Sequence, residues 1–498
     1  MLLGASLFLY LQLFVLPATP RVASGDQSLY LHNAARMYAG ELIYRDYDYF
    51  TLPGTDVVYL ALFKIFGIRI WIPQILLLVV GVATLVLSTK ISSKVMKGAA
   101  IYLPGLLFLT LPYASYLDAT HHLFNVFAAT AALAVMIEER TLARVAWAGV
   151  LWGLGTCFAQ SLVLGLIGTA IFLGWEGYRR AESWEFLVKK QLCLFGSYLL
   201  TVLVFNAYFV WKVGLKQFLY YTVIFVTKYY SADETSTWRT YMVGHSSFRG
   251  WQNWPDIVTW LLIHLLIPLV YILFFVRYWR EQRFHPQWPW ERLMLINATG
   301  MTLFLSIASA PAWNRLFTIS LFALILLVWF VSFPFKPERI LIRTLWVLVA
   351  VLTIVRPILT QARWSASLDL PTGRAAFFDP GSYQETKWLL NRTHPGDYFF
   401  GDQLICFDLK LRNPSRVAFI RPNDFTRPEE VRNIVEGLEN HKVRFVTWYQ
   451  GLDNPLAIEG NHLAPLRDYL EHNYHVAEHF ANGHKIWERN ALEGSSVK

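Results

Sequence analysis

The sequence predicts an all-α polytopic membrane protein with a small C-terminal extracytoplasmic α/β domain. Of its 498 residues, 55% are hydrophobic and only 16% are charged, whereas soluble proteins carry about 25% charged residues. Apolar runs fill most of residues 1–360, and residues 361–498 have the mixed composition of a soluble domain. We therefore predict a transmembrane domain over 1–360 and an α/β domain over 361–498.

The apolar runs are long enough to cross a bilayer as helices, which takes ~20 residues each. Helices suit this environment because they satisfy their own backbone groups inside hydrocarbon. The first run has no Lys or Arg before Arg21, which favours an uncleaved span over a signal peptide. We expect about eleven spans. They lie near 2–17, 70–89, 99–117, 122–137, 145–160, 161–177, 192–213, 257–276, 293–309, 316–333 and 340–357.

Basic residues gather in alternate loops, and the positive-inside rule makes those loops cytoplasmic. An odd number of spans then puts the N-terminus in the cytoplasm and the C-terminal domain outside. The net charge of +9 follows from this pattern, so we expect a multi-pass protein of the cell (inner) membrane, in contact with lipids and not with nucleic acid. The basic residues are Lys90, Lys94, Lys97, Arg140, Arg144, Arg179, Arg180, Lys189, Lys190, Arg277, Arg280, Arg283, Lys336, Arg339 and Arg343.

The first outer loop, 18–69, predicts two short helices at the membrane surface. Ser24 and Gln27 match a capping box, and apolar residues then recur at helical spacing on one face. Gly40 follows as the expected stop. A second apolar stretch, 57–66, is too short to span. Both segments are typical of helices that lie along the interface.

The C-terminal domain alternates helix and strand signals. The three cysteines of the chain do not indicate a disulfide framework, because Cys157 and Cys193 lie in apolar runs and Cys406 is alone in the soluble part. No phosphate-binding or dinucleotide-binding glycine motif occurs in it. We expect helices at 383–391, 429–441 and 466–473, and strands at 398–400, 417–420, 443–448, 476–480 and 485–488.

The polar residues that could support chemistry crowd the outer ends of the spans. Asp26 lies in the first turn of a predicted helix, where the helix dipole favours a carboxylate for structural reasons alone. An ionised carboxylate there is also what a general base requires. Asp118 has the same two interpretations, because it could merely cap the next span. His121 and His122 beside it are either interfacial anchors or part of a site.

Two arginines are candidates for holding a phosphate. Arg315 lies at the end of a predicted span, where arginine often only extends its charged group to the interface. Its planar guanidinium also fits a phosphate. Arg45, next to Asp46 in the first outer loop, is the other candidate.

The first loop resembles a known family in an ordered series of short motifs. The sequence is similar to the GT-C superfamily of polyprenyl-phosphate-sugar glycosyltransferases, and most similar to the RgtA/B/C/D-like branch. This branch is related to protein O-mannosyltransferases and lipid A aminoarabinose transferases. The motifs are Asp26-Gln27-Ser28-Leu29-Tyr30, Ala34-Ala35, Gly40, Tyr44-Arg45-Asp46-Tyr47, Leu52-Pro53-Gly54 and Phe63–Gly67.

The resemblance implies residue roles at matching positions. Asp26 matches the aspartate taken as catalytic in the family, and Asp118 matches the acidic residue of the second outer loop. The chain departs from many relatives at Gln27, where they have Glu, and at Leu52-Pro53-Gly54, where they have Lys-Pro-Pro. That lysine can meet the donor phosphate in some relatives. The remaining candidates for donor phosphate or substrate binding are Arg45, Asp46, His121, His122 and Arg315.

The implied activity is transfer of a sugar from a polyprenyl-phosphate donor to a glycan, lipid or protein acceptor of the cell envelope. The implied mechanism is inverting, with Asp26 as general base. No metal site is expected from the sequence, and a divalent cation stays open as a cofactor. Two alternatives are a lipid-linked glycan flippase or other transporter, and a non-catalytic membrane anchor for the outer α/β domain. A transporter predicts polar residues along the spans, and an anchor gives no reason for the acidic outer loops.

Overall fold

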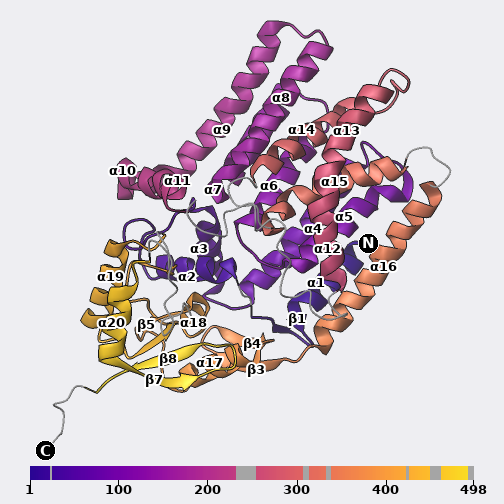
Figure 1. The fold of residues 1–498 in the computed structure, drawn as a ribbon. Helices are drawn as coiled ribbons and strands as arrows, with labels where there is room; N and C mark the ends of the chain where they lie inside the picture. Colours follow the sequence, from indigo (N-terminus) through magenta and orange to yellow (C-terminus); the bar gives the residue numbers. More distant parts are fainter. Residues whose placement is uncertain are drawn as a thin grey trace, which may run out of the picture.

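The computed structural model describes residues 1–22, 25–230, 254–306, 313–332, 338–421, 425–448 and 461–491. Long helices form a bundle, and a mixed unit of strands and helices built from the C-terminal residues lies at one end of it (Figure 1). Two short helices of the first loop, α2 and α3, lie between the bundle and that unit. The candidate site residues of the first loop therefore lie at this junction.

The bundle confirms a mostly helical membrane protein. Five helical segments of the described chain are long and apolar enough to cross a membrane: 72–92, 160–179, 184–213, 254–281 and 340–362. Shorter apolar helices accompany them, so the count of about eleven spans stays a prediction. The helices are α1 (Leu2–Leu13), α4 (Ile72–Ser92), α5 (Leu103–Phe108), α6 (His121–Met136), α7 (Leu142–Phe158), α8 (Val163–Arg179), α9 (Trp184–Val213), α10 (Leu215–Leu219), α11 (Val226–Lys228), α12 (Trp254–Leu261), α13 (Ile267–Glu281), α14 (Trp290–Phe304), α15 (Trp313–Ser332) and α16 (Glu338–Ala362).

The first helix is shorter than the predicted span at 2–17. It ends at Leu13 because the chain turns into a small antiparallel hairpin of β1 (Phe14–Val15) and β2 (Thr19–Pro20). The guanidinium of Arg21 donates to the carbonyl of Gln12 at 2.6 Å and satisfies one carbonyl of the helix end. The hairpin leads the chain directly to the start of α2.

The helix α2 (Asp26–Tyr38) ends as predicted, because Gly40 has a positive φ of 99° that suits glycine beyond a helix C-terminus. The expected cap residue Ser24 lies outside the described residues. The predicted capping box is wrong, because the N-cap residue is Gly25 without a side-chain cap and the side chain of Gln27 accepts a hydrogen bond from the distant Ala119 amide. The apolar stretch 57–66 belongs to α3 (Gly54–Phe66).

The residues after α16 contain a four-stranded sheet in the order β5 (Phe399–Phe400), β6 (Phe445–Trp448), β8 (Lys485–Arg489), β7 (Tyr474–His479). The first pair is parallel and the other pairs are antiparallel. A separate hairpin is formed by β3 (Ala366–Leu370) and β4 (Gly373–Phe377). The helices are α17 (Pro380–Leu390), α18 (Gln403–Asp408), α19 (Pro428–Asn440) and α20 (Ala464–Asn473).

Most of the predicted elements of this region are confirmed within a few residues, including the helices expected at 383–391, 429–441 and 466–473. The strand expected at 417–420 is wrong. The carbonyls of Val417 and Ala418 accept hydrogen bonds from the side chains of Asn413 and Gln403 rather than from a neighbouring strand. Local side-chain bonds therefore replace the ladder that a strand needs. The domain boundary near residue 360 stays a prediction.

Candidate active site

The N-terminus of α2 lies directly against Asp118. Gly25, the residue before the helix, has φ 92° and ψ −155°, a region that only glycine adopts readily. A Cβ atom at this position would stand 3.6 Å from Oδ2 of Asp118. Asp26 begins the helix and is exposed, whereas Asp118 is 6% exposed. The structure thus brings together two aspartates that are far apart in the sequence.

The segment that carries Asp118 is held by both helices of the first loop. The Gln27 side chain of α2 accepts from the amide of Ala119 at 2.7 Å. The hydroxyl of Tyr59 on α3 donates to the carbonyl of the same residue at 2.7 Å. Thr120 follows as the N-cap of α6. Both helices of the first loop therefore fix the backbone next to Asp118.

The two carboxyl groups of the pair have different environments. Burial, followed by the charge of Asp26, raises the pKa of Asp118 well above its usual range. Its Oδ1 is buried and forms no hydrogen bond. Asp26, at the start of α2, is exposed to solvent. The two carboxyls therefore differ in burial, and the buried one has the raised pKa.

His121 and His122 open α6 three and four residues after Asp118, and their rings contact each other at a tilt, with centroids 4.0 Å apart. The Nδ1 atom of His121 lies 2.6 Å from the hydroxyl of Tyr30 on α2. The ring of Tyr116 contacts that of His122 edge-on, with centroids 5.9 Å apart. The histidines are therefore oriented by aromatic residues of α2 and of the segment before α6.

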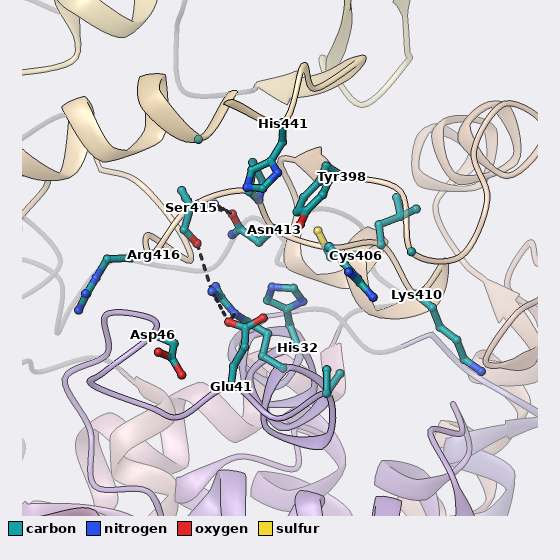
Figure 2. A pocket seen from close by; sticks show the side chains of 18 of the residues that line it. His32, Glu41, Asp46, Tyr398, Cys406, Lys410, Asn413, Ser415, Arg416 and His441 are labelled. Atoms are coloured by element: carbon teal, nitrogen blue, oxygen red, sulfur yellow. Dashed lines mark hydrogen bonds and ion pairs between the residues drawn. The ribbon is translucent and has the colours of Figure 1, made fainter. Parts of the chain in front are cut away.

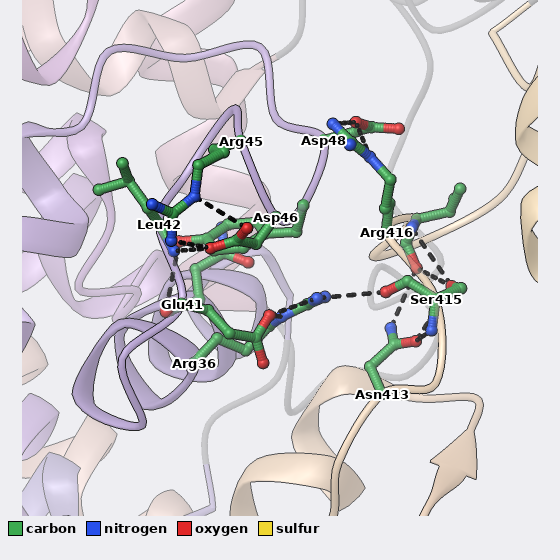
Figure 3. Close-up of polar contacts among 12 residues, drawn as sticks. Arg36, Glu41, Leu42, Arg45, Asp46, Asp48, Asn413, Ser415 and Arg416 are labelled. Atoms are coloured by element: carbon green, nitrogen blue, oxygen red, sulfur yellow. Dashed lines mark hydrogen bonds and ion pairs between the residues drawn. The ribbon is translucent and has the colours of Figure 1, made fainter. Parts of the chain in front are cut away.

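Arg45 and Asp46 lie elsewhere in the first loop and bind each other (Figure 3). The guanidinium donates to the carboxylate at 2.6 and 2.9 Å, and Asp46 also accepts from the amide of Leu42 at 2.7 Å. The hydrogen bond from Arg45 is the main cause that lowers the pKa of Asp46. No contact described for this pair joins it to Asp26 or Asp118. Its visible role is to hold a turn.

Arg315 lies in the first turn of α15, and its side chain is outside the described residues. The motif Leu52-Pro53-Gly54 leads into α3, where a Cβ atom on Gly54 would stand 2.5 Å from the carbonyl oxygen of Cys157. The glycine therefore allows α3 to begin against the end of α7. Gly54, where many relatives have proline, permits this close packing.

Sequence reasoning missed a buried acid beneath the site. Asp56, in the first turn of α3, is fully buried, and burial raises its pKa to about 8. This effect of burial outweighs the nearby Asn33 side chain, which favours the ionised form and lowers the pKa. A carboxyl directly before the apolar stretch 57–66 was the signal available in the sequence. A buried group with such a pKa is typical of functional sites.

Among the described residues, no three His, Cys, Asp or Glu side chains gather closely enough to hold a metal ion. Asp26 and Asp118 supply carboxylate oxygens, which are ligands that hard divalent cations prefer.

No family model and no curated sequence matches the chain. Solved structures do resemble it. ArnT from Cupriavidus metallidurans bound to undecaprenyl phosphate gives a TM-score of 0.61 at 12% identity, over 98% of this chain and 97% of that one. Its apo form gives 0.57 at 13% identity, over 97% and 96%. The archaeal oligosaccharyltransferase AglB from Archaeoglobus fulgidus, in complex with an inhibitory peptide and a dolichol-phosphate, gives 0.53 at 12% identity, over 100% and 74%.

At this level of identity the likeness concerns the fold. It extends over nearly the whole chain. The family resemblance predicted from the first-loop motifs is thereby confirmed for the architecture. The chain has the GT-C fold, which ArnT and AglB share.

Proposed function

We propose that this chain is an integral membrane glycosyltransferase that takes its sugar from a polyprenyl-phosphate carrier and transfers it to an acceptor of the cell envelope. The observation that supports the proposal is the position of the exposed Asp26 at the start of α2, which lies against the buried Asp118 close enough for the charge of Asp26 to raise the pKa of Asp118. The binding of undecaprenyl phosphate by ArnT and of a dolichol-phosphate by AglB supports a donor of this class.

The proposed reaction is a single displacement with inversion at the anomeric carbon. An acceptor hydroxyl attacks that carbon, its proton passes to the carboxylate of Asp26, and the bond from the anomeric carbon to the phosphate oxygen breaks. The polyprenyl phosphate leaves with the bonding electrons. Asp118, whose pKa is raised, holds its proton beside Asp26 and can donate a hydrogen bond to a substrate oxygen.

The negative charge on the leaving phosphate requires a nearby donor. His121 and His122 are the candidates next to the aspartate pair, and the ring of His121 is already oriented by Tyr30. Arg45 and Arg315 remain proposals for the same role. Arg45 would have to exchange its pairing with Asp46 for the phosphate.

The membrane fold suits a donor with a long isoprenoid tail. Each buried CH₂ group contributes about 0.8 kcal/mol, so the donor stays in the bilayer and the enzyme presents its site at the membrane surface. We propose that this surface is extracytoplasmic, with the N-terminus in the cytoplasm of a multi-pass inner-membrane protein. The basic loops support that orientation.

A deletion strain tests the function directly. Mass spectrometry of its surface glycans and lipids is expected to find one component that lacks a sugar residue. The wild-type gene should restore the sugar, and Asp26→Asn should not, although the variant protein reaches the membrane in equal amounts. An unchanged envelope, or full restoration by Asp26→Asn, would contradict the proposal. A flippase or a passive anchor would tolerate that substitution.

A further inference from the structure

A large cleft separates the first loop from the C-terminal unit and does not include the aspartate pair. Its volume is about 700 Å³, within the range of ligand-binding pockets. Its walls come from the second half of α2, the loop after it, the segment 395–416 and the helix α19 (Figure 2). This cleft is thus built from two regions that are distant in the sequence, and polar side chains from both face into it.

The floor of the cleft holds two buried polar groups with unused hydrogen-bonding capacity. His32 is 2% exposed, and its Nε2 atom forms no hydrogen bond. Arg36 is 7% exposed, and its Nη1 atom is also without a partner. Its other nitrogens bind Glu41 at 2.7 Å and the carbonyl of Ser415 at 3.2 Å. Buried polar atoms without partners are costly, and both of these belong to residues that line the cleft.

The walls offer aromatic faces and amide groups. Tyr398 and His441 stack with ring centroids 3.8 Å apart, and the ring of Tyr38 is 48% exposed on the opposite side. Asn433 and Asn440, both on α19, add side-chain amides near the rim. Flat apolar faces next to groups that both donate and accept hydrogen bonds suit a ligand with alternating C–H and hydroxyl surfaces.

The charges in the cleft argue against a simple anion. Lys410 and Arg412 form no ion pair within the described chain, which would favour an acidic ligand. Carboxylates of Glu41, Asp46 and Glu436 line the same cleft and would repel one. A hydroxyl-rich ligand uses both signs, because each hydroxyl donates one hydrogen bond and accepts others.

His32 further favours a neutral partner. Burial, together with the positive charge of Arg36, lowers the pKa of His32 to about 3. The imidazole therefore stays neutral at every physiological pH and offers one nitrogen as a donor or an acceptor, according to its tautomer. Such a group binds a hydroxyl well and contributes no charge for a phosphate or carboxylate.

We propose that this cleft binds a glycan segment of the acceptor, away from the hydroxyl that reacts. The inference rests on the proposed function and names the substrate class of a second site. Residues of a helix are rotated by about 100° each, so His32 and Arg36 lie on a different face of α2 from Asp26 and Tyr30. A saccharide chain that occupies the cleft would hold the acceptor while its terminal residue approaches the aspartate pair.

A binding assay tests the inference. The purified full-length protein in lipid nanodiscs is applied to a printed array of neutral and uronate-containing oligosaccharides. The wild type is expected to bind at least one neutral oligosaccharide. Asn440→Trp, which fills the rim of the cleft from an exposed position, should weaken this binding at least tenfold. His441→Ala, which removes the stacked ring, should weaken it as well. Arg432→Trp, an exposed position of the same helix outside the cleft, is the matched control and should bind as the wild type does.

The outcomes separate this inference from the proposed function. Asp26→Asn is expected to keep full binding to the array while it loses sugar transfer. If Asp26→Asn kept transfer, the proposed function would fail and the binding result would stand. The assignment of the cleft to a glycan would be wrong, even with sugar transfer intact, in any of three cases. The wild type could bind no oligosaccharide, it could bind only uronate-containing ones, or Asn440→Trp could bind oligosaccharides as well as the wild type does.

Discussion

The conformation of Gly25 is needed where α2 meets Asp118. Its φ of 92° and ψ of −155° lie in a region that costs other residues of order 1–3 kcal/mol. Gly25→Ala should therefore lower the free energy of unfolding by that amount, about 1–3 kcal/mol, and displace Asp26. The measurements are thermal unfolding in detergent and the rate of sugar transfer.

The matched control is Gly196→Ala, since Gly196 lies inside the helix α9 with open space around its Cα atom. That change should leave stability equal or higher, because alanine favours helices over glycine. If Gly25→Ala unfolded like the wild type and transferred sugar at the same rate, the glycine conformation at the start of α2 would not matter.

Asp56 predicts a pH-dependent stability. Its pKa is about 8 in the folded protein, against 3.8 for a free side chain. Below the lower value both states hold the proton. As the pH rises from 3.8 to about 8, the unfolded state releases its proton while the folded state retains it, so the folded state loses stability. Asp56→Asn removes this loss, and its melting temperature should exceed that of the wild type by a margin that grows across this window.

The exposed Asp468→Asn on α20 is the control for that series and should show no such widening. A constant gap between Asp56→Asn and the wild type from pH 4 to pH 8 would mean that the Asp56 carboxyl does not keep its proton on folding.

Single residues also show what sequence reasoning can reach. Asp26 and Asp118 could be named because the family pattern marks both positions, and the structure places them together. Their catalytic roles stay predictions. Gln27 matched a local capping pattern, yet it bonds to Ala119, which is 92 residues away in the chain. Such a tertiary contact leaves no trace in local spacing. Asp56 was missed although it directly precedes the apolar stretch 57–66, because its burial depends on packing that local spacing does not show.

At the scale of elements, an ion pair joins the first loop to the C-terminal unit. Asp48 accepts from the guanidinium of Arg416 at 3.1 and 3.2 Å, and the hydroxyl of Tyr221 donates to the same oxygen. Arg416→Ala should loosen the segment 41–50, which hydrogen exchange of its amides measures. Because partly exposed ion pairs contribute about 0.2–1 kcal/mol, exchange should accelerate by up to about fivefold.

Arg444→Ala is the control for this ion pair, because its pair with Glu488, at 2.9 Å, lies wholly within the C-terminal unit. Exchange in 41–50 should not change in that variant. Equal rates in the wild type and Arg416→Ala would show that apolar packing alone joins the two regions.

Elements with complete local signals were predicted well. The stop at Gly40 and the apolar stretch 57–66 belong to real helices. The segment 417–420 has the composition of a strand, but side chains of Asn413 and Gln403 satisfy its carbonyls. The expected surface helix α2 is instead covered, with Leu31, His32 and Asn33 all buried. Composition shows which residues are apolar and does not show what covers them.

For the whole molecule, the pattern of basic loops predicts the orientation in the membrane. In a cysteine-free background, Lys410→Cys should react with an impermeant thiol reagent added outside intact cells, and Lys97→Cys should react only after permeabilisation. Lys410 lies in the C-terminal unit and Lys97 in a basic loop after α4. The reverse labelling pattern would invert the topology and remove the extracytoplasmic site.

The overall architecture was predictable because apolar runs and loop charges act over long stretches and survive at 12% identity. The number of spans was less accessible. Several of the bundle helices are shorter than a bilayer requires, and their lengths depend on hairpins and turns such as β1–β2 that tertiary contacts create.

Sugar transfer by the purified protein tests the central claim most directly. The assay supplies polyprenyl-phosphate sugars and extracted envelope acceptors, and compares the wild type with Asp26→Asn and with the exposed Asp468→Asn. We predict that Asp26→Asn lowers the turnover rate by about 10²–10⁴-fold, as loss of a general base does, while donor binding and melting temperature stay unchanged and Asp468→Asn remains fully active. Undiminished turnover by a folded Asp26→Asn protein would contradict the account.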